Sequence, residues 1–259
     1  MQDEPRRSQT FVSAFARGLA VIEAFDGERA PLSLAEVAAR AGVDRAVARR
    51  MLMTLIELGL LAEAERHYRL TPRVLRLGYS FLSQTGLDGL AQPFVAEVAR
   101  RTGESCSVSV LDETDVVSVA HAPSPVHKLG FAFRPGTRWP AYAMASGRVL
   151  LASKPDPGLR ALLGRMQRKA FTPRTLVKVE AIIAAVRQAG WKGFALVDGE
   201  LEEGLMSVAV PVRNRNGDVI ASLNSSSSAA RTTARGFRDA VMPALLRASA
   251  EMSRILGVT

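Results

Sequence analysis

Residues 32–59 read LSLAEVAARAGVDRAVARRMLMTLIELG, and this stretch decides the fold of the N-terminal part of the chain. Ser33 stands directly before an apolar-periodic run, and Glu36 follows three residues later, which is the capping-box signature of a helix start. Gly42 ends this helix, and Asp44 is the expected N-cap of a second helix that continues almost to the end of the stretch. Two short capped helices joined by a tight glycine-containing turn are typical of a helix-turn-helix.

The flanking segments complete this pattern. Residues 11–25 place apolar side chains at three- and four-residue spacing, which predicts a preceding amphipathic helix. Residues 60–70 hold two short runs around the polar segment 63–66, which predicts a small β-hairpin, or wing. Pro72 begins a further helix that ends near Gly86, and we interpret it as a linker between two domains. The N-terminal part is therefore predicted to be a winged helix-turn-helix.

The second helix of the motif has two faces. At about 100° per residue, the face expected to pack in the core carries Val47, Met51, Leu55 and Leu58. The opposite face is rich in arginine, which can bind guanine through two hydrogen bonds, and alanine methyl groups can pack on thymine. Arginines on the solvated face of an ordinary helical bundle are the alternative interpretation. The residues predicted to contact DNA are Ser33, Arg45, Ala46, Arg49, Arg50, Arg66 and Arg69.

The composition indicates a globular protein. Of the 259 residues, 47% are hydrophobic and 23% are charged, and there are one cysteine and three histidines. These counts exclude a disulfide framework and argue against a Cys/His zinc cluster. No apolar run approaches the roughly 20 residues that span a bilayer, and the first residues lack the apolar core of a signal peptide. We expect a cytoplasmic protein that binds no membrane, metal or cofactor.

The charge is positive, but bulk charge does not single out the N-terminal part. The net charge is +9, of which residues 1–76 carry +2 and the remainder +7. A polyanionic partner is indicated instead by the clustering of arginines along the second helix of the motif, the wing and the start of the linker.

From residue 87 onward, strand-like and helix-like segments are mixed, and Asn216-Gly217 is typical of a hairpin turn. This pattern predicts an α+β domain with an antiparallel sheet. Strands are expected at 105–111, 116–120, 129–133, 193–197, 207–212 and 219–224, and helices at 93–101, 146–153, 157–166, 176–189 and 233–256.

Several motifs in both parts of the chain resemble the IclR family of bacterial regulators. The resemblance extends from about Phe11 to Leu256. Shorter motifs, including residues 45–50 and 104–111, are similar to the branch that controls aromatic-acid breakdown through protocatechuate and β-ketoadipate. The family motifs are FARGLAVI at 15–22, LAEVA at 34–38, YRLTPRVLRLG at 68–78, PAYAMASGRVLLA at 140–152, FTPRT at 171–175 and VAVPV at 208–212.

The resemblance implies a winged helix-turn-helix over residues 1–71, a linker helix over 72–87 and a GAF-like effector domain over 88–259. It also implies a double-stranded DNA operator, pairing into homodimers or dimers of dimers, and a small carboxylate effector. The expected effector comes from aromatic-acid catabolism, and an acid of the glyoxylate or acetate type is the alternative. Repressors and activators both occur in the family, so the sign of regulation stays open.

In family members with known ligands, the effector lies on one side of the sheet under a loop. The resemblance therefore implies an effector site made of Tyr142, Ala143, Met144, Ala145, Ser146, Gly147, Asp198, Ser207, Asn224 and Ser226. This chain departs from the family pattern, because many members have cysteine in place of Ser207 and serine in place of Asn224. The ligand of those members therefore cannot be assigned by analogy.

The residues themselves are compatible with a carboxylate site. Residues 145–147 begin a predicted helix, whose first amide groups can bind an anion. An aromatic ring would need flat apolar walls, and Arg134 and Arg138 could bind a carboxylate. Ser107 and Ser109 share one strand face, which either lines the site or meets solvent. The candidate walls are Tyr142, Met144, Phe131 and Phe133.

An enzyme is the rival class of protein. The segment around Ser146 lacks the G-x-S-x-G nucleophile elbow, and no P-loop or G-x-G-x-x-G is present. The spacing of His121 and His127 across a proline-containing loop matches no metal-ligand pattern. The sequence therefore predicts a DNA-binding regulator without catalytic residues.

Overall fold

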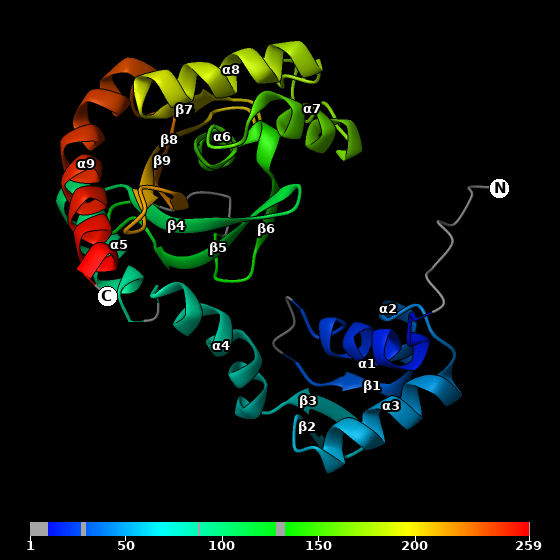
Figure 1. Ribbon diagram of the computed structural model, residues 1–259. Coiled ribbons are helices and arrows are strands. Elements are labelled where there is room, and N and C mark those ends of the chain that lie inside the picture. The colour runs from blue at the N-terminus through cyan, green and yellow to red at the C-terminus, as the bar shows by residue number, and fades with distance from the viewer. Residues whose placement is uncertain (1–9, 27–29, 88, 128–132, 259) are drawn as a thin grey trace. The chain divides into compact units, whose positions relative to one another are not determined.

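The computed structural model describes residues 10–26, 30–87, 89–127 and 133–258 (Figure 1). The chain divides into two compact units, residues 1–81 and 82–259. The division falls inside α4 (Leu75–Thr85), which is the helix interpreted as a linker.

Within its described residues, the first unit combines helices with a small antiparallel sheet of order β1-β3-β2. Leu32 pairs with Tyr68 between β1 and β3, and Leu61 pairs with Leu70 between β2 and β3. The elements before α4 are α1 (Ser13–Glu23), β1 (Leu32–Ser33), α2 (Leu34–Arg40), α3 (Arg45–Glu57), β2 (Leu61–Ala64), β3 (His67–Leu70) and the 3-10 turn η1 (Pro72–Val74).

Both predicted helix caps form. The backbone N–H of Glu36 donates to Ser33 Oγ at 3.4 Å, and the backbone N–H of Ser33 donates to Glu36 Oε2 at 2.7 Å, which completes the capping box of α2. The N–H of Val47 donates to Asp44 Oδ1 at 2.8 Å at the start of α3. Side-chain acceptors thus satisfy amide groups that have no partner inside the helix, and the helix-turn-helix is confirmed.

The core face of α3 differs in part from the predicted one. Val47 and Leu55 are buried as expected, but Leu58 is 53% exposed. Leu58 is the C-cap residue at the end of α3. Leu52, which is fully buried, takes its place against Val21 and Val37 of the neighbouring helices.

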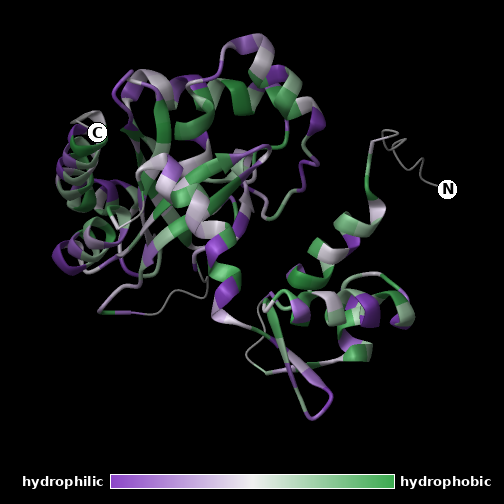
Figure 2. Ribbon diagram, turned by 60° about the horizontal axis from the view of Figure 1, so that its bottom comes forward, coloured by the Kyte–Doolittle hydropathy of each residue, from purple (hydrophilic) through white to green (hydrophobic). Residues whose placement is uncertain are grey.

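The predicted wing is the hairpin of β2 and β3. Its turn residues Glu65 and Arg66 have φ angles of 52° and 61°, the left-handed conformation that a type I′ hairpin turn requires at both positions. The polar tip of this hairpin is purple in Figure 2.

The second unit is an α+β domain around an antiparallel sheet of order β6-β5-β4-β9-β8-β7. Its elements are α5 (Ala91–Thr102), β4 (Ser105–Asp112), β5 (Asp115–Ala122), β6 (Arg138–Pro140), the 3-10 turn η2 (Ala141–Ala143), α6 (Ala145–Leu151), α7 (Asp156–Arg165), α8 (Val179–Lys192), β7 (Ala195–Asp198), β8 (Leu205–Arg213), β9 (Val219–Ser228) and α9 (Ala234–Val258).

The two faces of the sheet are covered differently. Helices α5 and α9 pack on one face, and the short helix α6 lies within the curve of the sheet on the other (Figure 1). Val108, Leu223 and Phe237 belong to the apolar core of the α5/α9 side. Because side chains alternate along a strand, the neighbours of Val108 and Leu223 point toward the side of α6.

The predicted strands differ from the observed ones in three places. The strand predicted from Gly193 begins at Ala195, because Gly193 is the C-cap of α8 with a φ of 73°, a conformation that favours glycine. The strand β6 was not predicted, since three residues are too few to show a period. Of the strand expected at 129–133, all but Phe133 lies outside the described residues, and Phe133 is not in a strand.

Candidate DNA-binding and effector sites

The predicted DNA-reading face of α3 is open to solvent. Arg45, Ala46, Arg49 and Arg50 are all exposed. None of the three guanidinium groups has a hydrogen-bond or ion-pair partner among the described residues. An uncommitted guanidinium on a capped helix is free to bind base edges or phosphates.

The remaining predicted DNA contacts lie on the helix start and the wing. Arg66 is exposed at the wing tip and Arg69 is exposed on β3. Ser33 is already engaged in the capping box, because its hydroxyl donates to Glu36 Oε2 at 2.7 Å. Ser33 therefore has less capacity for a phosphate than the two wing arginines.

The sheet face that α6 covers is lined by buried polar side chains, and we call it the serine face. Cross-strand register arranges them in rows. Ser105 of β4 pairs with Ser226 of β9, which pairs with Ser207 of β8. The serine face consists of Ser105, Ser107, Ser109, Ser118, His121, Ser207, Ser222, Asn224 and Ser226.

Several hydroxyl groups here lack partners. The hydroxyls of Ser109, Ser146 and Ser207 make no hydrogen bond with any described residue, although none of the three residues is more than 6% exposed. Among the described serines, only Ser227, on the opposite face, has a hydroxyl that is both unpartnered and fully enclosed. The unpartnered hydroxyls of Ser109, Ser146 and Ser207 are not fully enclosed, so each of them borders space that a water-sized molecule can reach. Buried polar groups are normally satisfied, so this surface is suited to a polar ligand.

Asn224 lies at the centre of the serine face. Its register partners are Ser107 on β4 and Ala209 on β8. The side-chain amide donates to Ser226 Oγ at 3.4 Å, which is a long contact. The residue is 2% exposed, so most of its hydrogen-bonding capacity is left for something bound beside it.

The predicted loop closes over this surface. Ala145 of α6 packs in one cluster with Ala209, which places the start of α6 beside Asn224. The N-cap residue Met144 provides no side-chain acceptor, so the first amide groups of α6 have no partner within the helix. These amides and the nearby hydroxyls can together donate to a carboxylate.

A glycine permits this closure. A Cβ atom built on Gly147 would lie 1.9 Å from the carbonyl oxygen of Ala141 in η2. The backbone of α6 therefore approaches the preceding turn more closely than any side chain allows. Tyr142 secures that turn, because its hydroxyl donates to the Lys169 carbonyl at 2.7 Å and its ring stacks on Phe171.

Asp198 is not brought together with the other predicted effector residues. It pairs in register with Met206, a residue of the α5/α9 core, so it points away from the serine face. Its carboxylate accepts from Arg174 Nη1 at 2.8 Å. Ser207, Asn224 and Ser226 share the serine face, and Ala145 at the start of α6 packs beside them.

The sequence missed a buried ion pair beside the loop. Arg148 of α6 donates through Nη2 to both carboxylate oxygens of Glu200, at 2.7 and 2.6 Å. The N–H of Leu176 also donates to this carboxylate, at 3.2 Å. Because removing one partner of such a pair leaves a buried charge, Glu200 fixes α6 in its position above the sheet.

Two further expectations about the carboxylate site change. Arg138 Nη1 donates to Asp112 Oδ2 at 2.6 Å, and the same side chain forms an exposed ion pair with Asp115. Arg134 is also exposed. Phe133 is buried beside the serine face, whereas Phe131 lies outside the described residues. His121, Ser118 and Ser222 belong to the serine face but were not predicted as effector residues. Their only sequence signal is the alternation of side chains along a strand, which does not distinguish residues that line a binding site from residues that face solvent.

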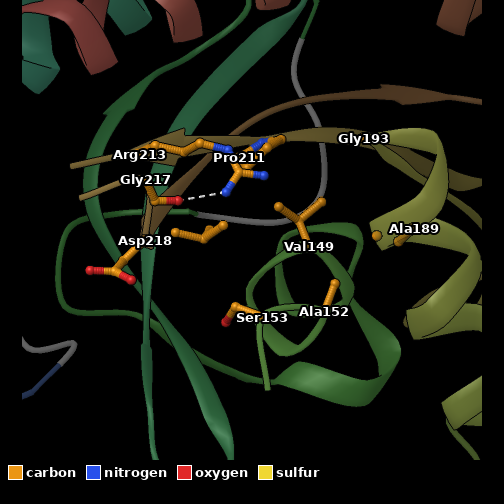
Figure 3. A pocket seen from close by; sticks show the side chains of 11 residues that line it. Val149, Ala152, Ser153, Ala189, Gly193, Pro211, Arg213, Gly217 and Asp218 are labelled. Carbon is orange, nitrogen blue, oxygen red and sulfur yellow. Dashed lines mark hydrogen bonds between the residues drawn. The ribbon is translucent and has the colours of Figure 1, made fainter. Parts of the chain in front are cut away.

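A separate cavity lies at the other end of α6 (Figure 3). It has a volume of about 340 Å³ and lies between α6, the end of α8 and the hairpin of β8 and β9. Its polar groups are engaged: Arg213 Nη1 donates to the Gly217 carbonyl at 2.7 Å, and Asp218 accepts from the side chain of Asn214. The serine face differs in its unpartnered donors.

The described residues show no other chemical centre. Among them, no group of three or more histidine, cysteine and acidic side chains is placed to hold a metal ion, and no helix is long and apolar enough to cross a membrane. Burial raises the pKa of the Cys106 thiol, which therefore stays protonated.

A winged helix-turn-helix followed by an α+β domain with a covered polar face defines the class of protein: a DNA-binding regulator with its own sensing domain. Two family models match the chain. The IclR helix-turn-helix domain matches residues 14–65, and the bacterial transcriptional regulator IclR C-terminal domain matches residues 79–254. The chain belongs to the IclR family of bacterial transcriptional regulators, and it is a regulator rather than an enzyme.

Named relatives resemble the chain over nearly its whole length. The Pca regulon regulatory protein of Pseudomonas putida is 38% identical over 242 residues, which are 93% of this chain and 83% of that protein. The p-hydroxybenzoate hydroxylase transcriptional activator of Acinetobacter baylyi is 33% identical over 257 residues, which are 98% of this chain and 95% of that protein.

A solved structure matches the second unit. It is the inducer-binding domain of the PobR transcription factor from Acinetobacter, a double mutant in complex with 3-hydroxybenzoic acid. The TM-score is 0.59 at 28% identity, and the match covers 62% of this chain and 94% of that one.

Proposed function

We propose that this regulator binds a small aromatic carboxylate on the serine face, and that binding changes its affinity for a double-stranded DNA operator. The unpartnered hydroxyls of Ser109, Ser146 and Ser207 carry the proposal. A carboxylate accepts hydrogen bonds but donates none when it is ionised. It therefore fits a buried surface whose unused hydroxyl groups can each donate a hydrogen bond.

The site provides for both ends of such a ligand. The amides at the start of α6 and the hydroxyls of Ser146 and Ser207 can hold the carboxylate, with Asn224 beside them. Met144 and Phe133 are buried apolar side chains next to this surface, and they can pack on a ring. The names of the relatives support the aromatic class, since one is an activator for p-hydroxybenzoate hydroxylase and another was solved with 3-hydroxybenzoic acid.

In this proposal, α3 reads the operator through Arg45, Arg49 and Arg50, and the wing arginines Arg66 and Arg69 bind phosphates. The uncommitted state of the α3 guanidinium groups supports the first part. Contacts to phosphate position a protein on the duplex, and contacts to base edges give it sequence preference.

We also propose that the protein works as a homodimer or a dimer of dimers. Large apolar side chains are exposed on two helices: Phe15 of α1 is 68% exposed, and Leu75 and Tyr79 of α4 are 71% and 56% exposed. Apolar surface gathered on a helix face marks an interaction site. A second copy of the chain fits because one operator half-site for each copy matches the symmetry of such dimers.

Calorimetry on the full-length protein tests the effector site. Wild type is titrated with benzoate, 4-hydroxybenzoate, protocatechuate and glyoxylate, beside Asn224→Leu and the control Ser227→Ala, which changes a serine of the same strand on the opposite face. We expect an aromatic acid to bind wild type and the control, and to give no heat with Asn224→Leu.

A normal titration of Asn224→Leu would reject the site. Heat from glyoxylate alone would reject the aromatic class. Circular dichroism of each variant shows that the fold is retained, and a ligand at 100 times its Kd should add about 2.7 kcal/mol of stability to wild type.

A further inference from the structure

One row of the serine face contains a histidine. His121 of β5 pairs in register with Ser107 of β4, which pairs with Asn224 of β9. Ser107 Oγ and His121 Nδ1 are hydrogen-bonded at 2.9 Å. Neighbouring strands lie about 4.8 Å apart, so this pair stands one to two strands away from Asn224 and farther from the start of α6.

His121 keeps one ring nitrogen free. Nδ1 is hydrogen-bonded to Ser107 Oγ, and the imidazole also interacts with the Cys106 backbone. No hydrogen-bond contact joins Nε2 to another described residue. Burial lowers the pKa of His121 below its ordinary value, against the opposing effect of the Cys106 backbone, and this favours the neutral imidazole. A neutral imidazole has one donor and one acceptor nitrogen, and it can therefore exchange a hydrogen bond with a hydroxyl group without adding charge to the site.

The surroundings of His121 suit an aromatic ring. The centroid of the Phe133 ring lies 6.3 Å from that of the imidazole, and the centroid of the Trp139 ring lies 6.4 Å from that of Phe133. The hydroxyl of Ser118 already donates to the Phe133 carbonyl at 3.1 Å, so its hydrogen is not available to a ligand. The aromatic side chains thus gather at the β5 side of the serine face, and the carboxylate donors gather at the β8 and α6 side.

We propose that Ser107 and His121 bind the ring hydroxyl of the aromatic acid, so that this site prefers hydroxybenzoates to benzoate. The inference rests on the proposed function, because it assumes that the serine face holds an aromatic carboxylate. With the carboxylate beside Asn224 and the start of α6, the opposite end of the ring reaches toward β5. Ser107 holds the imidazole through Nδ1 and lies next to the ring hydroxyl, which binds to Nε2 of His121.

A selectivity measurement separates this role from a structural one. Kd values for benzoate, 3-hydroxybenzoate and 4-hydroxybenzoate are measured by calorimetry with full-length wild type, His121→Phe, Ser107→Ala and the control Ser227→Ala. We expect wild type and the control to bind at least one hydroxybenzoate roughly tenfold more tightly than benzoate, because a binding site built for a hydroxyl leaves its polar groups unpaired when the hydroxyl is missing.

In His121→Phe and Ser107→Ala this ratio should fall toward one, while the Kd for benzoate changes by less than about threefold. A ratio that persists in both variants would overturn the inference, and so would equal losses for benzoate and the hydroxybenzoates. If wild type binds benzoate and both hydroxybenzoates equally, the inference fails while the proposed function stands. If wild type binds none of the three, both fail. Ser107→Ala removes one oxygen only, so it decides the matter if His121→Phe does not fold.

Discussion

At the scale of single residues, the two sites differ in how their side chains are held. The α3 arginines are exposed, and their guanidinium groups have no hydrogen-bond or ion-pair partners among the described residues. This is expected of side chains that bind an external polyanion. The polar side chains of the serine face are buried and fixed by strand register. Preorganised buried donors give selectivity for a small ligand, whereas mobile surface cations give affinity that depends on salt.

Arg49 offers a single-residue test of the proposed DNA interface. Arg49→Ala should weaken binding to the specific operator by roughly 1–3 kcal/mol and relax the preference at one base position, because a bidentate contact to a base is lost. Arg69→Ala on the wing is the matched comparison, and it should weaken binding to specific and random DNA alike. Fluorescence anisotropy with both DNAs measures the two effects. An equal loss on random DNA for Arg49→Ala would make Arg49 a phosphate contact instead.

Helical periodicity predicted which residues of α3 are exposed, but the strand pattern did not predict which face of the sheet every polar side chain occupies. Arginines on the outer face of a capped helix follow from helical periodicity alone, and the exposure of Arg45, Arg49 and Arg50 agrees with that prediction. The orientation of Asp198 could not be predicted, because a shift of one position along a strand moves a side chain to the opposite face. The register with Met206 settles that point.

At the scale of elements, the position of α6 decides whether the serine face is a closed site. This helix is held from one side by the Arg148–Glu200 ion pair and from the other by its close approach to η2 at Gly147. Local sequence signals gave the helix itself but not these contacts, since Glu200 is 52 residues away in the chain. Long-range pairing of this kind has no periodic signature.

Gly147→Ala tests the contact between α6 and η2. The added methyl group overlaps the Ala141 carbonyl, so we expect a loss of roughly 1–3 kcal/mol in the free energy of unfolding together with weaker effector binding. Gly164→Ala is the control, because Gly164 lies in α7 with open space around its Cα; there an alanine should stabilise the protein by about 0.4–1 kcal/mol. Urea denaturation measures both. Unchanged stability of Gly147→Ala would show that α6 does not rest on the turn.

At the scale of the whole molecule, the chain joins a reader of DNA to a sensor of a small acid. Family membership follows from matches to both parts, and the unit boundary falls within α4, the helix that connects them. A coupling between two such sites requires that the ligand binds more tightly to one state of the protein than to another. The Arg148–Glu200 pair and the loop over the serine face are the elements that a bound carboxylate would bias.

The measurement that tests this account most directly is the affinity of the full-length protein for DNA upstream of its own gene, with and without a saturating aromatic acid. We predict a specific complex at low salt whose Kd changes at least about fivefold when 4-hydroxybenzoate or protocatechuate is added. In Asn224→Leu the Kd for DNA should stay the same and the response to the acid should disappear. Failure to bind any upstream segment, or an unchanged Kd in the presence of an acid that calorimetry shows to be bound, would contradict the account.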